Sequence, residues 1–227
     1  MKMIKAYIRY VLYLLKMRTT IPGALINKKP IRENGDELVD LRQVPGLFFD
    51  KSFGHRPVLI RSGVAERLKQ AQTLLPSGLH FKILSAYRSM KEQQELYDFH
   101  YQQMKTSYPR ASATDWERMT KAICAKPGNN AGSGHQTGGA IDITLCDELG
   151  NELDMGTKYL EMCSKTPTAS KEISEPSRNN RKILKSVLHA VGMQNYPNEW
   201  WHFCYGDRMW AMYQHQKYAL YGPRDSI

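Results

Sequence analysis

Hydrophobic and polar positions follow a helical period in some stretches of the chain and a strand period in others. Apolar residues recur at helical spacing over residues 63–75, which predicts a helix. Residues 80–87 alternate and are rich in β-forming side chains, which predicts a strand. Ser89 and Glu92 then have the spacing of a capping box, so a further helix is expected over residues 89–104.

The second half of the chain shows the same two periods with irregular segments between them. Thr114 and Glu117 repeat the capping-box spacing and predict the start of another helix. The remaining expected elements are a strand over residues 140–145, a short helix over 156–163, a helix over 178–192 ended by Gly192, and a last strand over 199–206. Because helices come early and strands later, the order favours an α+β single domain with a small antiparallel sheet flanked by helices over a regular βαβ repeat.

The first twenty residues, MKMIKAYIRYVLYLLKMRTT, form a basic amphipathic pattern. Two sets of residues occupy different faces of a helix: Lys2, Lys5, Arg9 and Lys16 on one, and Ile4, Ile8, Val11, Leu12 and Leu15 on another. Such a helix can lie on an anionic membrane surface, or it can pack on the domain as a structural element. Its longest uncharged run is too short to span a bilayer, and Arg9 interrupts the apolar region that a signal peptide needs.

Net charge separates this segment from the rest of the chain. Residues 1–32 hold eight of the 32 Lys and Arg residues and no acidic residue, which leaves 24 basic and 22 acidic residues over 33–227. The overall charge of +10 therefore belongs mainly to the N-terminal segment, and no nucleic-acid partner is expected. A polar stretch over 26–37 predicts the join between a basic segment, residues 1–32, and a domain, residues 33–227.

The four cysteines show no CxxC pair and no close clustering, which argues against a thiolate zinc site. The chain is long enough to form its own core without disulfides. The sequence is therefore consistent either with two disulfides or with four reduced thiols. We expect a cytoplasmic protein, at the membrane surface if the N-terminal helix binds lipid, with export to the periplasm as the alternative.

The stretch SGHQTGGAIDI, residues 133–143, places a histidine, three glycines and an aspartate close together. On a straight helix His135 and Asp142 would lie roughly 10 Å apart along the axis, too far for two ligands of one ion. Gly138 and Gly139 allow the chain to turn before the strand, so that the two side chains can meet. Taken alone, this pair is better explained by a glycine-rich turn beside a surface ion pair, and a third ligand is needed to favour a metal site.

A further histidine and a carboxylate occur together in the segment NEWWH. If Glu199 lies in the turn before the last strand and His202 at its start, both can approach the same metal. Catalytic zinc commonly has three protein ligands and a water, and a carboxylate that is not a ligand can take the proton of that water. Arg88, at the end of a strand and before a helix cap, could stabilise an oxyanion or be an ordinary surface residue.

Four segments of this sequence resemble a known family: SGHQTGGAIDITL, LDMGT, SAYRS and EWWH occur in the order and spacing of the zinc D-alanyl-D-alanine dipeptidases. The resemblance runs from about Glu37 to Asp207. It implies one zinc ion per chain in the small sheet, with a ligand set of His135, Asp142 and His202. It further implies that Glu199 is the general base, that Arg88 stabilises the tetrahedral intermediate and that Ser133 helps to hold the substrate.

The implied activity is hydrolysis of the D-alanyl-D-alanine dipeptide or of a related peptidoglycan-derived peptide. In the family the arginine strand usually reads D-A-Y-R-P, whereas here Ser85 replaces the acid and Ser89 the proline. Two alternatives therefore remain: a D,D-carboxypeptidase that trims peptidoglycan stem peptides, and a non-catalytic protein that holds zinc and binds cell-wall fragments. The basic N-terminal segment has no counterpart in the family pattern, so a peripheral membrane contact through residues 1–20 is a separate expectation.

Overall fold

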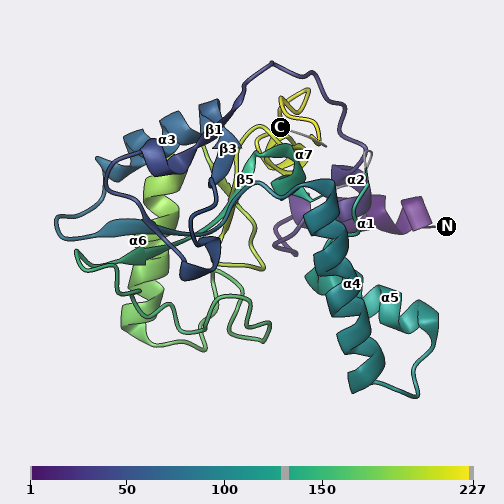
Figure 1. The fold of residues 1–227 in the computed structure, drawn as a ribbon. Helices are drawn as coiled ribbons and strands as arrows, with labels where there is room; N and C mark the ends of the chain where they lie inside the picture. Colours follow the sequence, from purple (N-terminus) through teal and green to yellow (C-terminus); the bar gives the residue numbers. More distant parts are fainter. Residues whose placement is uncertain (1, 129–132, 225–227) are drawn as a thin grey trace.

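A five-stranded sheet forms the centre of the protein, which is described by a computed structural model over residues 2–128 and 133–224 (Figure 1). The strand order is β2-β4-β5-β7-β6, with β2 (Phe48–Phe49), β4 (His80–Ser85), β5 (Ala140–Cys146), β7 (His202–Cys204) and β6 (Gln194–Asn195). All neighbouring strands are antiparallel except β2 and β4, which are parallel. A separate pair joins β1 (Leu38–Asp40) to β3 (Leu59–Arg61). The expected α+β class and the antiparallel centre of the sheet are confirmed.

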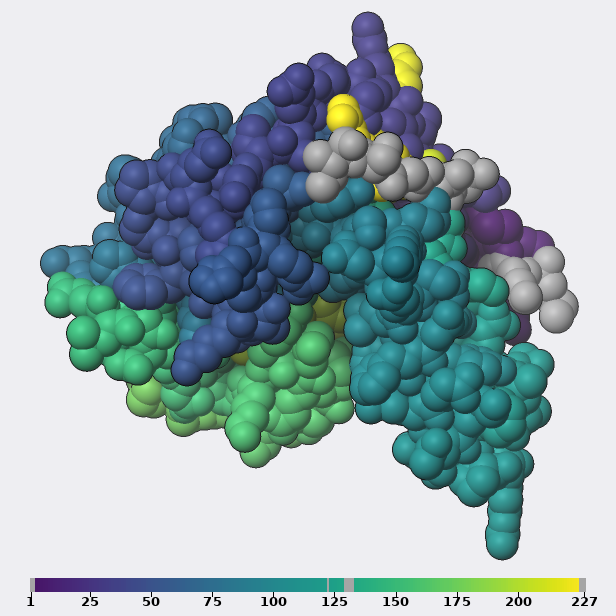
Figure 2. All heavy atoms as spheres, in the orientation of Figure 1, coloured from purple at the N-terminus to yellow at the C-terminus, as the bar shows by residue number. Residues whose placement is uncertain are grey.

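Two helices pack together on one side of the molecule: α3 (Ser62–Gln72) contacts α6 (Glu175–Ala190), which also contacts β5 (Figure 1). Elsewhere α4 (Met90–Ser107) and α5 (Ala113–Ile123) form a hairpin that stands out from the body (Figure 2). The other helical elements are α1 (Lys2–Leu14), α2 (Gly23–Ile26), α7 (Arg208–Tyr213), η1 (Leu41–Gln43), η2 (Lys51–Phe53) and η3 (Gly134–Thr137).

The hydrophobic core lies between the sheet and the α3–α6 pair. Leu68 of α3 and Leu184 of α6 are fully buried in one cluster with Ile141 and Ile143 of β5. These two isoleucines alternate with Asp142, and successive side chains of a strand point to opposite faces. One face of β5 therefore fills the core while the other presents its aspartate to a polar site.

Several local predictions are confirmed, and two are wrong. The capping box of Ser89 and Glu92 begins α4 as expected. The other cap is Ser112, whose side chain accepts a hydrogen bond from Asp115 N, so Thr114 lies inside α5 and does not begin it. Residues 156–163 form turns instead of a helix. Leu160 has φ 63°, which an α-helix cannot contain.

The early part of the chain also contains strands that the pattern did not predict. The strands β1, β2 and β3 all precede α3, so helices do not simply come before strands. Each is only two or three residues long, which is too short for an alternating pattern to be recognised.

Residues 2–32 pack against the body of the protein through several contacts. Tyr13 contacts Tyr213 edge-to-face at 5.7 Å, Ile21 N donates to the Tyr213 hydroxyl at 3.1 Å, and Ile31 forms a bridge with Ala219. Among the described residues, none of the helices combines the length and apolar character needed to cross a bilayer. All four cysteines are free thiols.

Candidate active site

The centre of the candidate site is Asp142, on the middle strand of the sheet. In the strand register Asp142 is paired with His202 on β7 and with Ser85 on β4. Residues that are paired across neighbouring strands have side chains on the same face. The sheet therefore brings Ser85 and His202 to the two sides of one buried carboxylate, although they are far apart in sequence.

His135 reaches the same carboxylate from the short helix η3. Gly138 ends η3 in a left-handed conformation, with φ 66°, and this turn carries the chain back into β5. His135 Nδ1 donates to Ala86 O at 2.8 Å, so the proton lies on Nδ1 and the free Nε2 faces Asp142. The turn expected from the glycines is confirmed, and it brings the two residues together.

His135, Asp142 and His202 form a compact cluster of metal-binding atoms. Asp142 Oδ1 lies 3.4 Å from His135 Nε2 and 2.9 Å from His202 Nδ1, and the three donor atoms all lie within 4.8 Å of one another. Ligands of a tetrahedral zinc, each about 2.0–2.2 Å from the ion, are themselves roughly 3.3 Å apart. Two imidazoles and one carboxylate are a donor set of catalytic zinc, and zinc is the cofactor that this site fits.

The electrostatics of the cluster keep Asp142 ionised. Burial alone would raise the pKa of this carboxyl, but the neighbouring His135 and His202 hold its pKa well below the usual value. Burial is also the main reason why the pKa of His135 is lowered, which favours the neutral imidazole that a metal binds.

Tyr159 holds the second oxygen of this carboxylate. Its hydroxyl donates to Asp142 Oδ2 at 2.8 Å, and its ring lies edge-to-face on Trp201 at 5.5 Å between centroids. Hydrogen bonds to a ligating carboxylate fix its orientation and tune metal affinity. Asp142 Oδ1 is thereby left directed toward the two imidazoles.

Glu199 lies in the turn that joins β6 to β7. Asn195 clamps this turn, because its side-chain NH₂ group donates to Glu199 O at 3.1 Å and to His202 O at 3.0 Å. Burial raises the pKa of Glu199 to about 7, against the opposing effect of His202. Its side chain also receives a hydrogen bond from Trp201. A carboxyl group with such a pKa can both accept and release a proton near neutral pH.

Arg88 follows β4 and is fixed by neutral partners. Its backbone N–H donates to His135 O at 3.1 Å, which ties it to η3. Its guanidinium donates to Ser85 Oγ at 3.0 Å and to Gln93 Oε1 at 2.8 Å. Gln93 is buried and is itself anchored by donating to Ala125 O at 2.6 Å. The two side chains seen to hold the guanidinium, Ser85 and Gln93, are both neutral.

The segment LDMGT supports the turn that carries Glu199 and His202. The indole N–H of Trp200 donates to Thr157 Oγ1 at 2.8 Å, and Met155 is buried in the same core as Trp200. Arg181 of α6 donates to Met155 O at 2.7 Å and so fixes the segment to this helix. Two motifs that are far apart in sequence thus form one packed unit beside the site.

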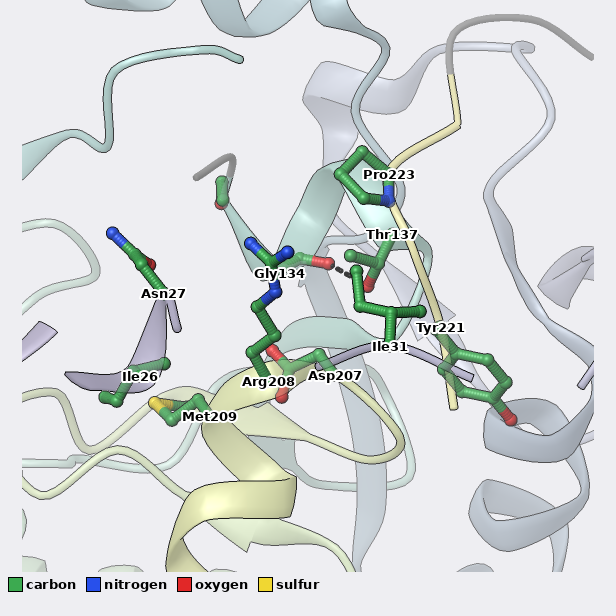
Figure 3. Close-up of a pocket in the computed structure, with 11 residues that line it drawn as sticks. Ile26, Asn27, Ile31, Gly134, Thr137, Asp207, Arg208, Met209, Tyr221 and Pro223 are labelled. Carbon is green, nitrogen blue, oxygen red and sulfur yellow. Dashed lines mark hydrogen bonds between the residues drawn. The ribbon is translucent and has the colours of Figure 1, made fainter. Parts of the chain in front are cut away.

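Ser133 lies at the first turn of η3, where its hydroxyl accepts a hydrogen bond from His135 N at 3.3 Å. It also lines a cavity of about 70 Å³, which is lined by Gly134 and Thr137 of the same turn but by none of His135, Asp142 and His202 (Figure 3). Figure 3 shows Asp207 and Arg208, at the start of α7, facing the turn that carries Gly134 and Thr137. The predicted role of Ser133 in holding substrate stays a prediction, since its observed contact is a helix cap.

Arg61 supports the opposite end of the same turn. Its backbone N–H donates to Gly138 O at 2.9 Å and its Nε to Thr137 O at 2.7 Å. The guanidinium also binds Glu33 at 3.0 Å, Asp36 O at 2.6 Å and Gly222 O at 3.1 Å. This buried arginine joins the linker before the domain, the metal-binding turn and the C-terminal segment.

The structure brings together the sequence-predicted metal ligands, and it places Arg88 and Glu199 next to them. Sequence reasoning missed four supporting residues: Arg61, Gln93, Tyr159 and Asn195. Of these, only Gln93 had a signal in the sequence, because it lies in the first turns of the helix that directly follows Arg88. The others come from segments whose distance to the site is set by tertiary packing.

Comparisons with known proteins agree with this geometry. A family model described as D-ala-D-ala dipeptidase, of the M15 peptidases, matches residues 51–220. The chain therefore belongs to this family and is a peptidase. A D-alanyl-D-alanine dipeptidase of Synechocystis sp. (strain ATCC 27184 / PCC 6803 / Kazusa) is 29% identical over 199 residues, which cover 74% of this chain and 80% of that protein. One from Escherichia coli (strain K12) is 39% identical over 72 residues, covering 32% of this chain and 37% of that protein.

Solved structures share the fold. A mutant of the vancomycin resistance D,D-pentapeptidase VanY in complex with Zn(II) aligns with a TM-score of 0.51 at 19% identity, covering 85% of this chain and 92% of that one. VanYB in complex with D-alanine-D-alanine aligns with a TM-score of 0.52 at 18% identity, covering 83% and 90%. At these sequence identities the structural alignments establish only that the fold is shared. The assignment of the chain to the family is based on the sequence matches.

Proposed function

We propose that this peptidase hydrolyses the D-alanyl-D-alanine dipeptide with one zinc ion held by His135, Asp142 and His202. The observation that carries the proposal is the position of a half-buried carboxylate, Glu199, in the same turn as His202 and within electrostatic range of Asp142. A metal-binding cluster with an adjacent base of pKa about 7 is the arrangement that hydrolysis by an activated water requires.

Each residue has a role that follows from its position. When bound, zinc supplies a water of lowered pKa and polarises the peptide carbonyl. Glu199 accepts a proton from the attacking water and returns it to the leaving amine. Arg88 directs its guanidinium N–H groups at the oxygen that becomes negative, and a cation held by the neutral side chains of Ser85 and Gln93 is well suited to this. Ser133 contacts the substrate from the first turn of η3.

Two observations favour the dipeptide as the substrate. The curated relatives that match this chain are D-alanyl-D-alanine dipeptidases. The segments LDMGT and EWWH, which distinguish the dipeptidase pattern, are packed together through Trp200 and Thr157.

The experiment is an assay of free D-alanine released from D-alanyl-D-alanine and, separately, from a peptidoglycan stem pentapeptide, with the zinc-loaded protein. We expect release from the dipeptide. Release from the pentapeptide alone would move the assignment to a D,D-carboxypeptidase. Zinc binding without release from either would leave a protein that only binds cell-wall fragments.

A further inference from the structure

The N-terminal helix α1 exposes a continuous set of apolar side chains, which we call the apolar stripe: Ile4, Tyr7, Ile8, Val11, Leu14 and Leu15. Each is between 51% and 65% exposed. At 3.6 residues per turn they occupy an arc of roughly 120° on one side of the helix. Leu15 continues this arc because its N–H donates to Val11 O at 2.9 Å, in the helical pattern. Exposed apolar area of this extent on one element marks an interaction surface.

The opposite side of α1 is fixed to the protein, so the stripe faces outward. Ala6 is buried, and Tyr13 packs edge-to-face on Tyr213 of α7. The chain that follows is anchored through Ile21, which is 3% exposed. Figure 1 shows α1 at the edge of the molecule, on the far side from α3 and α6. The apolar stripe is therefore already accessible to a partner, and α1 does not have to detach from the protein to expose it.

Basic side chains border the stripe on the remaining arc of the helix. Lys5 and Arg9 lie on this arc and are exposed, Lys16 is exposed just beyond the end of the helix, and the chain contains no acidic residue before Glu33. Long basic side chains beside an apolar face can reach phosphate groups while that face enters the acyl region of a bilayer. We propose that α1 docks this protein on an anionic lipid surface, with the apolar stripe inserted and the basic residues at the headgroups.

The charge distribution favours lipid over the other occupants of such a face. A second copy of this chain would bring like-charged helices together, with no acid in either segment to offset the repulsion. Nucleic acid would satisfy the basic residues but would leave the aliphatic side chains of the stripe in water. An anionic bilayer offers phosphate groups to the basic residues and an apolar interior to the aliphatic side chains of the stripe.

The test is co-sedimentation of the full chain with two vesicle preparations, phosphatidylcholine alone and a mixture in which about one lipid in three is phosphatidylglycerol. We expect binding to be at least about tenfold stronger on the anionic vesicles and to weaken as salt is added. Failure to bind the anionic vesicles, or equal binding to both preparations, would overturn the proposal.

A matched pair of variants separates the apolar stripe from net charge. Ile8→Glu with Val11→Glu places two acids in the stripe and should weaken binding to the anionic vesicles by more than about tenfold. Phe99→Glu with Leu149→Glu adds the same charge at positions outside α1 that are 57% and 84% exposed, and should largely retain binding. Equal losses in both pairs would show that only net charge matters and would contradict docking through the stripe.

Two further readouts keep this result independent of the peptidase activity and of self-association. Release of D-alanine from the soluble dipeptide should be unchanged in Ile8→Glu with Val11→Glu, because neither residue contacts the site. Sedimentation velocity should show the same species for the original chain and this variant. A dimer that the two substitutions abolish would assign the stripe to a second copy and would overturn the lipid proposal.

Discussion

Arg88 donates a hydrogen bond from its guanidinium to the side-chain oxygen of Gln93 at 2.8 Å. The second contact of the guanidinium is to Ser85 Oγ, so neither of these partners carries a negative charge. In the family pattern an acid stands at the position of Ser85. In this chain the orientation of Arg88 therefore depends on a buried amide from the following helix.

Replacing Gln93 tests this dependence. In Gln93→Leu one N–H of Arg88 loses its acceptor, and kcat/KM for the dipeptide should fall by about tenfold to a hundredfold, the usual effect of losing a hydrogen bond to a charged group. Gln94→Leu, one position along the same helix and bonded to exposed Asp98, is the control and should keep full activity. Unchanged kcat/KM in Gln93→Leu would show that Ser85 alone positions Arg88.

Tyr159 gives a prediction about metal affinity. Tyr159→Phe removes the hydrogen bond to Asp142 Oδ2 but keeps the ring against Trp201. We expect the dissociation constant for zinc, measured by competition with a chromophoric chelator, to rise by about ten- to a hundredfold. Tyr108→Phe changes an exposed tyrosine away from the site and should leave zinc affinity as it is. An unaltered affinity in Tyr159→Phe would mean that Asp142 is oriented without this hydroxyl.

Arg61 should contribute strongly to stability. Its side chain is fully buried and donates to one carboxylate and three carbonyl groups, a pattern that a single ammonium group cannot reproduce. Urea unfolding of Arg61→Lys should show a free energy of unfolding lower by about 3 kcal/mol. Arg56→Lys alters an exposed pair with Glu92 and should change it by less than about 0.5 kcal/mol. Equal effects of the two substitutions would rule out the structural role of Arg61.

Asp154 should make stability depend on pH. The hydrogen bonds from Ser177 and from Gly156 N lower the pKa of this carboxyl below its ordinary value of 3.8. A lowered folded-state pKa stabilises the protein above pH 3.8, and this contribution is lost as the pH falls through the folded value. The melting temperature of Asp154→Asn should be lower than that of the original chain at pH 7, and the gap should close as the pH falls below 3.8 and through the lowered folded-state pKa. A gap of constant size would show that the charge of Asp154 is not involved.

The sequence predicts those parts of the fold that one short segment determines. Ser89 and Glu92 begin α4 as their spacing indicates, and Gly138 turns the chain where a helix would have separated His135 from Asp142. The helix predicted over 156–163 fails for a local reason as well. Gly156 and Leu160 both have positive φ, 80° and 63°, in a segment whose backbone is held by Asp154 and Arg181.

The grouping of His135, Asp142 and His202 was predictable because the glycines allow the first two to meet and the family resemblance pointed to the third. The supporting residues were not predictable, since their roles come from the sheet register and from loops that return to the site. Tyr159 reaches Asp142 from a segment that looked helical, and Asn195 acts through the backbone of a turn. No spacing rule connects such residues to a site before the fold is known.

The central claim is that Glu199 is the base beside a zinc held by His135, Asp142 and His202. The most direct test is the rate of D-alanine release by Glu199→Gln, measured together with its zinc content. We predict that kcat falls by about 10²- to 10⁴-fold while one zinc ion per chain is retained. A variant that keeps its zinc and hydrolyses the dipeptide within a few-fold of the original rate would contradict the account.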